Sequence, residues 1–251
     1  MSGTVHIERA APRVLRLVID NPPMNPLGAD MRAHFLRALD EVEADDEVRA
    51  IIVTGAGERA FCGGDDLKDA RPEAKDLSSF GVLLERLDAT RVPTIGAING
   101  WCVGGGFELS LCCDIRIAST EAHFVCAGVN MGLMASAWRL PRLIGVSRAK
   151  AMLLTGLPHD AETAERFGLV TALHAPDTLQ GAAVALAERI ASRAPLSVEA
   201  TKRIAARAPD LSAEEAAPLQ AKELSVLRHS EDHREAVTAF RERREPSFHR
   251  R

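Results

Sequence analysis

One stretch decides how this chain is interpreted, and it reads Asn99-Gly100-Trp101-Cys102-Val103-Gly104-Gly105-Gly106-Phe107-Glu108-Leu109. It directly follows an apolar run, residues 94–98, that is predicted to be a strand. Glycines allow a backbone to approach a ligand closely and to direct free N–H groups at it. The stretch therefore predicts a ligand-binding loop at the end of a strand. The alternative is that Gly104–Gly106 only permits tight packing between a helix and the sheet.

A second glycine cluster supports the ligand-binding interpretation. It reads Phe61-Cys62-Gly63-Gly64-Asp65-Asp66-Leu67-Lys68 and follows another predicted strand, Ala50–Thr54. Two such segments at strand ends can supply two N–H donors to one oxygen atom, which is the arrangement called an oxyanion hole. Together they predict a site that stabilises negative charge on an oxygen.

The pattern around these clusters is that of an α/β protein. Further apolar runs at Val14–Ile19 and Ile115–Ala118 predict strands, and a helical pattern lies between them. In that pattern, residues 31–43, the side chains Met31, Phe35, Leu39 and Val42 share one face, whereas Arg32, Arg37 and Glu41 lie elsewhere. Strands separated by helices imply crossover connections and a largely parallel sheet covered on both faces.

After Pro141 the pattern changes to successive helices. They are predicted over Arg148–Thr155, Ala161–Phe167, Leu179–Arg193, Leu196–Arg207 and, as one charged stretch, Ala213–Arg244. We therefore predict an α/β core over residues 1–195 and a helical C-terminal region over residues 196–251.

Composition limits the classes of function. The 251 residues are 46% hydrophobic, with a net charge of −4 and five cysteines. This excludes a disordered chain or a disulfide scaffold and argues against nucleic-acid binding. No apolar run approaches the roughly 18–20 residues that span a bilayer, so no membrane partner is expected. An odd number of scattered cysteines fits reduced thiols and a cytoplasmic location.

A dinucleotide-binding fingerprint is the one competing motif. Residues 55–60, Gly55-Ala56-Gly57-Glu58-Arg59-Ala60, match G-x-G-x-x-A after a strand. The fingerprint requires a helix to follow, and residues 61–64 are too rich in glycine to begin one. We interpret residues 55–60 as a turn.

Beyond these arguments, the sequence resembles the enoyl-CoA hydratase/isomerase family, the crotonase superfamily. The resemblance is carried by Phe61–Lys68, by Asn99–Asp114, and by three flanking segments: residues 21–27, 139–145 and 239–248. It extends over essentially the whole chain. It implies a crotonase-like α/β spiral of ββα repeats with a helical C-terminal region used in trimer formation, so that a homotrimer or a dimer of trimers is expected.

The resemblance also implies a ligand and a site. The ligand would be an acyl-CoA or enoyl-CoA thioester, with no metal and no cofactor besides the coenzyme A of the substrate. The thioester carbonyl would accept hydrogen bonds from the backbone N–H groups of Asp65 and Gly105, and Glu108 would be the catalytic acid/base. The segments that would hold the rest of the substrate lie around Met24, Gly64, Asp66, Leu67, Lys68, Gly104, Gly128 and Trp138.

The chain departs from the family pattern at two positions. The second glutamate of a hydratase is replaced by Gly128, and residues 122–159 contain neither Asp nor Glu. The loop that follows, Leu133–Trp138, also differs and is shorter. At Asp65 the family has a small or apolar residue; we interpret this side chain as solvent-facing or backbone-capping, with a substitute acid/base as the alternative.

The sequence therefore predicts an enzyme of the enoyl-CoA hydratase/isomerase type in which Glu108 is the only retained catalytic glutamate. One alternative is a protein that binds acyl-CoA without converting it. Another is a decarboxylase or thioester hydrolase that uses only the oxyanion hole, for which Arg139 and His123 are the available polar partners of the acyl group. The buried-thiol interpretation is favoured for Cys62, Cys102 and Cys126.

Overall fold

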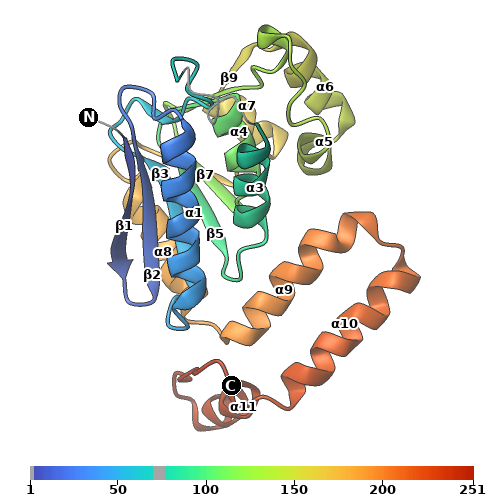
Figure 1. Ribbon diagram of the computed structural model, residues 1–251. Helices are drawn as coiled ribbons and strands as arrows, with labels where there is room; N and C mark the ends of the chain where they lie inside the picture. The colour runs from blue at the N-terminus through green and yellow to red at the C-terminus, as the bar shows by residue number, and fades with distance from the viewer. Residues whose placement is uncertain (1–2, 70–76) are drawn as a thin grey trace.

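The chain forms two sheets, and Figure 1 shows helices packed on the larger one. The computed structural model describes residues 3–69 and 77–251. In this part of the chain the larger sheet has six strands in the order β1-β2-β3-β5-β7-β10. Their bounds are β1 Thr4–Ala11, β2 Val14–Asp20, β3 Ala50–Gly55, β5 Thr94–Ile98, β7 Ile115–Ser119 and β10 Ala172–His174. Only β1 and β2 pair in antiparallel fashion; the other neighbours are parallel, as predicted.

The smaller sheet has the order β4-β6-β8-β9. Its strands are only three residues long: β4 Ala60–Cys62, β6 Trp101–Val103, β8 His123–Val125 and β9 Pro158–Asp160. Strands β4, β6 and β8 each follow a strand of the larger sheet within a few residues, and helices α3 (Leu77–Asp88) and α4 (Gly105–Leu111) follow β4 and β6. The order strand, strand, helix thus repeats along the chain. This confirms the predicted ββα spiral.

The larger sheet is covered on both faces, which explains why β3 and β5 are buried along their whole length. On one face Ile51 and Val53 belong to an apolar cluster with Phe35 of α1 (Ala29–Ala44) and Leu83 of α3. On the other face Ile52 packs in a cluster with alanines of α8 (Leu179–Ala191). Successive side chains of β3 therefore point to opposite faces of the sheet and belong to two separate apolar clusters.

The remaining helices form two groups. Between β8 and β10 lie η1 Val129–Met131, α5 Arg139–Ile144, α6 Val146–Thr155 and α7 Ala161–Phe167. After α8 come α9 Pro195–Arg207, η2 Ala208–Asp210, α10 Ala213–Arg228 and α11 Glu231–Glu242. Figure 1 shows α9 and α10 as a hairpin that projects from the body of the protein. No helix within the described ranges has the length and apolar character needed to cross a bilayer.

The C-terminal stretch predicted as one run over Ala213–Arg244 is divided at Ser230, whose hydroxyl caps α11 by accepting a hydrogen bond from the His233 N–H. The tail beyond α11 returns to the core. The guanidinium of Arg49 donates to the Phe248 carbonyl, and Asp232 accepts hydrogen bonds from the N–H groups of His249 and Arg250. The end of the chain thus anchors α11 beneath the larger sheet.

Candidate active site

The two glycine clusters predicted from the sequence meet in space. A Cβ atom at Gly64, whose φ is +89°, would lie 2.7 Å from the Gly105 nitrogen. A Cβ atom at Gly105 would lie 3.3 Å from the Gly64 Cα atom. The loop after β4 and the beginning of α4 are therefore in backbone contact, and this contact leaves no room for a side chain at position 64. Met24 joins them, because its carbonyl accepts a 2.7 Å hydrogen bond from the Gly63 N–H.

Two N–H groups are directed away from secondary-structure partners at this contact. Gly105 is the first residue of α4, so its N–H has no acceptor within the helix. Asp65 forms a parallel bridge with Leu27, in which the Leu27 N–H donates to the Gly64 carbonyl at 2.7 Å. Because successive N–H groups of an extended backbone point to opposite sides, the Asp65 N–H turns away from Leu27. The Gly64–Gly105 contact thus brings the backbone of the two glycine clusters together.

Glu108 occupies the first turn of α4, and its carboxylate is held by a residue far along the chain. Its Oε1 atom accepts a 2.6 Å hydrogen bond from the Ser136 N–H and lies 3.3 Å from the Ser136 hydroxyl. Ser136 is buried and has a φ of +59°, a left-handed conformation that is uncommon for a residue with a Cβ atom. No pattern in the sequence indicated this contact.

Gly128 lies beneath the same loop. A Cβ atom at this position would lie 3.0 Å from the Leu133 carbonyl oxygen and 3.1 Å from the Ala135 nitrogen. The Gly128 carbonyl accepts hydrogen bonds from the N–H groups of Met131 and Leu133. The segment after Gly128 therefore folds back over it.

Asp65 is partly buried, and its carboxylate faces α1. Its Oδ1 atom lies 3.4 Å from a guanidinium nitrogen of Arg32, which is 1% exposed. Within the described residues this oxygen accepts no hydrogen bond although it is shielded from solvent. Burial raises the pKa of the Asp65 carboxyl, and the positive charge of Arg32 opposes that rise. The side chain is 31% exposed, so it is only partly solvent-facing, and its Oδ1 atom faces a buried cation.

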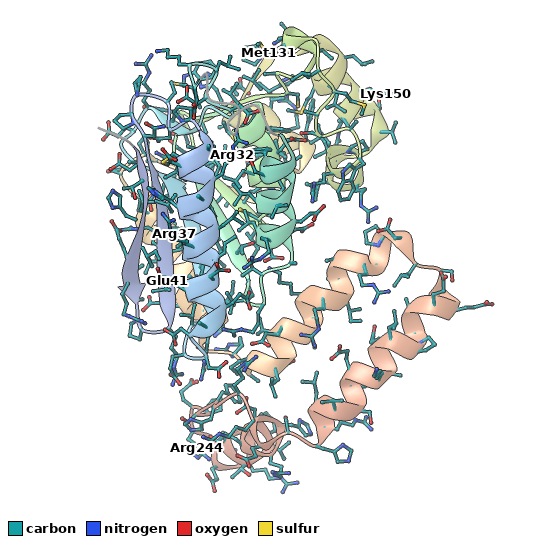
Figure 2. All side chains as sticks on the ribbon, viewed as in Figure 1. Arg32, Arg37, Glu41, Met131, Lys150 and Arg244 are labelled. Atoms are coloured by element: carbon teal, nitrogen blue, oxygen red, sulfur yellow. The ribbon has the colours of Figure 1, made fainter. Side chains whose placement is uncertain are left out.

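Arg32 itself was expected away from the buried face of its helix. Instead its guanidinium donates to the Leu27 carbonyl and to the Ser79 hydroxyl, and it lies over the Phe80 ring. Figure 2 shows Arg32 near the beginning of α1, with Arg37 and Glu41 further along the helix. A buried arginine with these partners positions the carboxylate next to the Gly64–Gly105 contact.

Comparison with known proteins decides the family. The sequence model of the enoyl-CoA hydratase/isomerase family matches residues 9–251. The chain belongs to this family. It is 39% identical to (E)-benzylidenesuccinyl-CoA hydratase of Thauera aromatica, over 90% of this chain and 91% of that protein. It is 34% identical to short-chain-enoyl-CoA hydratase of Clostridium acetobutylicum, over 92% of each chain.

Solved structures agree with the sequence comparison. The crystal structure of enoyl-CoA hydratase from Bacillus anthracis superposes with a TM-score of 0.95 at 30% identity, over 99% of this chain and all of that one. The structure of Pseudomonas aeruginosa DspI superposes with a TM-score of 0.92 at 32% identity, over 98% and 97%. The fold of this family member is therefore that of enoyl-CoA hydratases.

In this enoyl-CoA hydratase/isomerase family member, the residues after Asp65 form an exposed turn. The Asp66 carboxylate accepts a hydrogen bond from the Lys68 N–H at 3.0 Å, and the Asp66 carbonyl accepts one from the Asp69 N–H. Leu67 is 76% exposed, and Lys68 is also exposed. The turn thus presents backbone and one cation to solvent beside the Gly63–Met24 contact.

Trp138 lies elsewhere, at the beginning of α5. The Arg139 guanidinium stacks 4.2 Å from the centroid of its ring and also pairs with Asp88. Trp138 and Arg139 line a groove of about 1300 Å³ that continues along α9 past Val198 and Thr201. The structure therefore places Trp138 between the core and the C-terminal helices.

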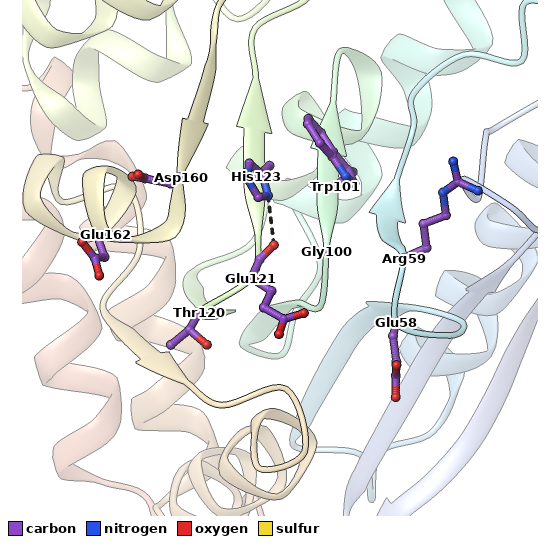
Figure 3. Close-up of a pocket in the computed structure, with 9 residues that line it drawn as sticks. All are labelled: Glu58, Arg59, Gly100, Trp101, Thr120, Glu121, His123, Asp160 and Glu162. Atoms are coloured by element: carbon purple, nitrogen blue, oxygen red, sulfur yellow. Dashed lines mark hydrogen bonds between the residues drawn. The ribbon is translucent and has the colours of Figure 1, made fainter.

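His123 belongs to a separate pocket of about 640 Å³ (Figure 3). Its ring stacks on Trp101 with 4.6 Å between the ring centroids, and its Nδ1 atom lies 3.0 Å from the Glu121 carbonyl oxygen. None of the predicted site residues is among the described residues that line this pocket. His123 is thus not placed where it would contact a substrate beside Glu108.

The cysteines near the site are buried. Burial raises the pKa of the Cys62 and Cys126 thiols to about 12. At neutral pH these thiols are therefore protonated, which agrees with small buried side chains and not with nucleophiles.

Proposed function

We propose that this protein converts an enoyl-CoA thioester by stabilising its enolate between the Asp65 and Gly105 N–H groups, with Glu108 moving the proton. The observation that carries the proposal is the backbone contact between Gly64 and Gly105, one helical turn from Glu108. Hydratases that act on CoA thioesters are among its relatives, over more than nine-tenths of the chain in the case of the Clostridium enzyme.

The chemistry follows from where negative charge develops. When a nucleophile adds to C3 of a 2-enoyl thioester, or when a proton leaves the carbon next to the carbonyl, an electron pair moves onto the carbonyl oxygen. Two N–H donors fixed in advance stabilise that charge without reorganising, and one such donor is typically worth about 2.7–4 kcal/mol of barrier. The same pair of donors therefore serves hydration and isomerisation.

Glu108 first removes a proton and later returns one. In hydration its carboxylate takes a proton from water while the water oxygen bonds to C3, and the resulting carboxylic acid returns a proton to C2. In isomerisation it removes a proton from one carbon and returns it to another. General acid–base catalysis of this kind contributes roughly 10²–10⁴-fold. A single carboxylate suffices for either reaction, because the proton that it removes is balanced by the proton that it returns.

The exposed turn supports the placement of the coenzyme A portion. Backbone groups at Met24, Asp66 and Leu67 would hold the adenine end, and Lys68 would pair with a phosphate. Gly64 and Gly104 give the thioester access to the two N–H donors, and Gly128 borders the acyl group. Trp138 would contact the acyl chain only at its far end. We propose no metal and no further cofactor, since the steps above need only the side chains named.

We also propose a homotrimer or a dimer of trimers in the cytoplasm. Helix α10 has no residue buried within the chain, and Leu224 and Val226 on it are exposed, as is Phe240 on α11. An exposed apolar face of this kind is usually covered in an assembly. Light scattering would test it, and a stable monomer at micromolar concentration would contradict it.

The test uses a short 2-enoyl-CoA and its 3-enoyl isomer in D₂O, followed by mass spectrometry. Added D₂O indicates hydration, whereas deuterium exchange or double-bond movement alone indicates a proton shift. The variant Glu108→Gln should lose each of these activities while retaining affinity for the thioester within about threefold. A wild-type protein that binds the thioesters and changes neither would instead support a binding protein.

A further inference from the structure

The loop that follows Gly128 reaches into the site and ends on Glu108. Ser136 is 6% exposed, its N–H donates to Glu108 Oε1 at 2.6 Å, and its φ is +59°. Hydrogen bonds to a charged acceptor are among the stronger ones in proteins, and this one is short. A left-handed non-glycine residue that is buried against an ionisable side chain suggests a functional constraint.

The same loop occupies the space next to Gly128. Leu133 and Ala135 approach so closely that a Cβ atom at Gly128 would meet backbone atoms at 3.0 and 3.1 Å. Backbone atoms cannot swing aside as the tip of a flexible side chain can. A side chain at position 128 therefore requires the backbone of the observed loop to move by a few tenths of an ångström, and a carboxylate there would crowd the loop further.

We propose that Ser136 is the positioning residue for Glu108, and that the loop over Gly128 replaces a second carboxylate by a backbone N–H donor. This inference rests on the proposed function, because it assigns a role to the partner of Glu108. Ser136 acts through Glu108 and holds its Oε1 atom in one place. The sequence change at Gly128 and the unusual loop are then two parts of one rearrangement.

A chemical consequence follows for the proton. Among the described residues Glu108 Oε1 has the Ser136 donors, and no protein donor bonds Oε2. Oε2 is therefore the oxygen that accepts the proton and returns it. Because Ser136 holds Oε1, the position of Oε2 is fixed as well. Oε2 therefore removes and returns the proton on one face of the substrate.

The experiment removes the Ser136 N–H and little else. Replacing Ser136 by its α-hydroxy acid converts the 135–136 amide to an ester, which keeps the side chain and lets φ remain positive. The matched control is the same replacement at Met131, whose N–H donates at 3.0 Å to the Gly128 carbonyl within the same loop. The readouts are kcat and KM for deuterium exchange at the α-carbon of a short acyl-CoA.

We expect the Ser136 ester to lower kcat by about ten- to a hundredfold, the range that a hydrogen bond to a charged group is worth, with KM within about threefold. The Met131 ester should stay within about threefold in both. A Ser136 ester with wild-type kcat overturns the inference, and so do equal losses in the two esters, because they would indicate only loop integrity. If instead Glu108→Gln exchanges normally, the proposed function itself fails, so the two failures are distinct.

A second variant tests the replacement directly. In Gly128→Glu the new side chain displaces the loop and breaks the Ser136–Glu108 hydrogen bond, so exchange should fall, not rise. Circular dichroism and the unfolding midpoint establish that the variant folds. Hydration above the wild-type rate in a folded Gly128→Glu protein would overturn the inference.

Discussion

Two carboxylates lie next to the contact between the glycine clusters, and they have different partners. Glu108 receives a backbone N–H from a distant loop, whereas Asp65 faces the buried guanidinium of Arg32. A backbone donor carries no net charge, so it orients Glu108 without neutralising it. A guanidinium offsets the charge of Asp65 close to the place where an enolate oxygen would become negative. Under the proposed function, the carboxylate of Glu108 moves the proton, whereas that of Asp65 is paired with a cation.

The largest effect should come from removing the reactive member of the pair. Glu108→Gln keeps the shape of the side chain and the oxygen that accepts the Ser136 N–H, but it cannot take a proton. We expect α-proton exchange to fall by about 10²–10⁴-fold. Mass spectrometry in D₂O measures it, with acyl-CoA affinity followed separately by calorimetry. Exchange at the wild-type rate would remove Glu108 from the mechanism.

Next in size is the loss of one N–H donor between the two carboxylates. Gly105→Pro deletes that donor at the first helical position, where proline is well tolerated. We expect kcat to fall by about 10²–10³-fold. Gly105→Ala is the control, since it introduces the same Cβ atom, 2.7 Å from the tip of the Phe80 ring, and keeps the N–H. Equal losses in both variants would assign the effect to crowding.

The contacts of these two carboxylates also separate what the sequence predicted from what it did not. Glycine clusters after apolar strands indicated a ligand-binding loop at each strand end, because strand–glycine patterns are local, whereas Glu108 came from the family resemblance. The contact of Ser136 with Glu108 spans 28 residues and depends on a left-handed φ at a serine, which no local pattern indicates. Arg32 was misplaced for a similar reason: helical periodicity assigns a charged side chain to solvent, and only tertiary contacts reveal its buried partners.

The same distinction holds for the fold. The predicted strand at Thr94–Ile98 is confirmed to the residue, and that at Ala50–Thr54 is one residue longer, because long apolar runs identify buried strands. The strands of the smaller sheet were not predicted. Each has three residues, too few for a period, and β6 lies inside a glycine motif that favours a loop. Pairing with neighbouring turns of the spiral decides their conformation.

Removing the guanidinium of Arg32 should leave the negative charge of Asp65 without its positive partner. Arg32→Met keeps the length of the side chain and loses the charge together with the hydrogen bonds to Leu27 and Ser79. We expect the free energy of unfolding to fall by about 3 kcal/mol, as when one partner of a buried ion pair is removed. Urea unfolding measures the change. The double variant with Asp65→Asn should lose less than Arg32→Met alone, and a strictly additive result would show that the two charges are not coupled.

The smallest effect concerns pH and Asp65 alone. Because burial raises the pKa of this carboxyl in the folded state above its ordinary value of 3.8, the folded protein binds more protons than the unfolded chain between those two values. The stability contribution of Asp65 is therefore fully present below pH 3.8 and is lost as the pH rises through the raised value. Asp65→Asn has no such proton to lose. Thermal midpoints from pH 7 down to about pH 4 should thus move in favour of the wild type relative to Asp65→Asn as the pH falls. A shift in the opposite direction would mean that Arg32 outweighs burial, and the two carboxylates would then be alike in being held as anions.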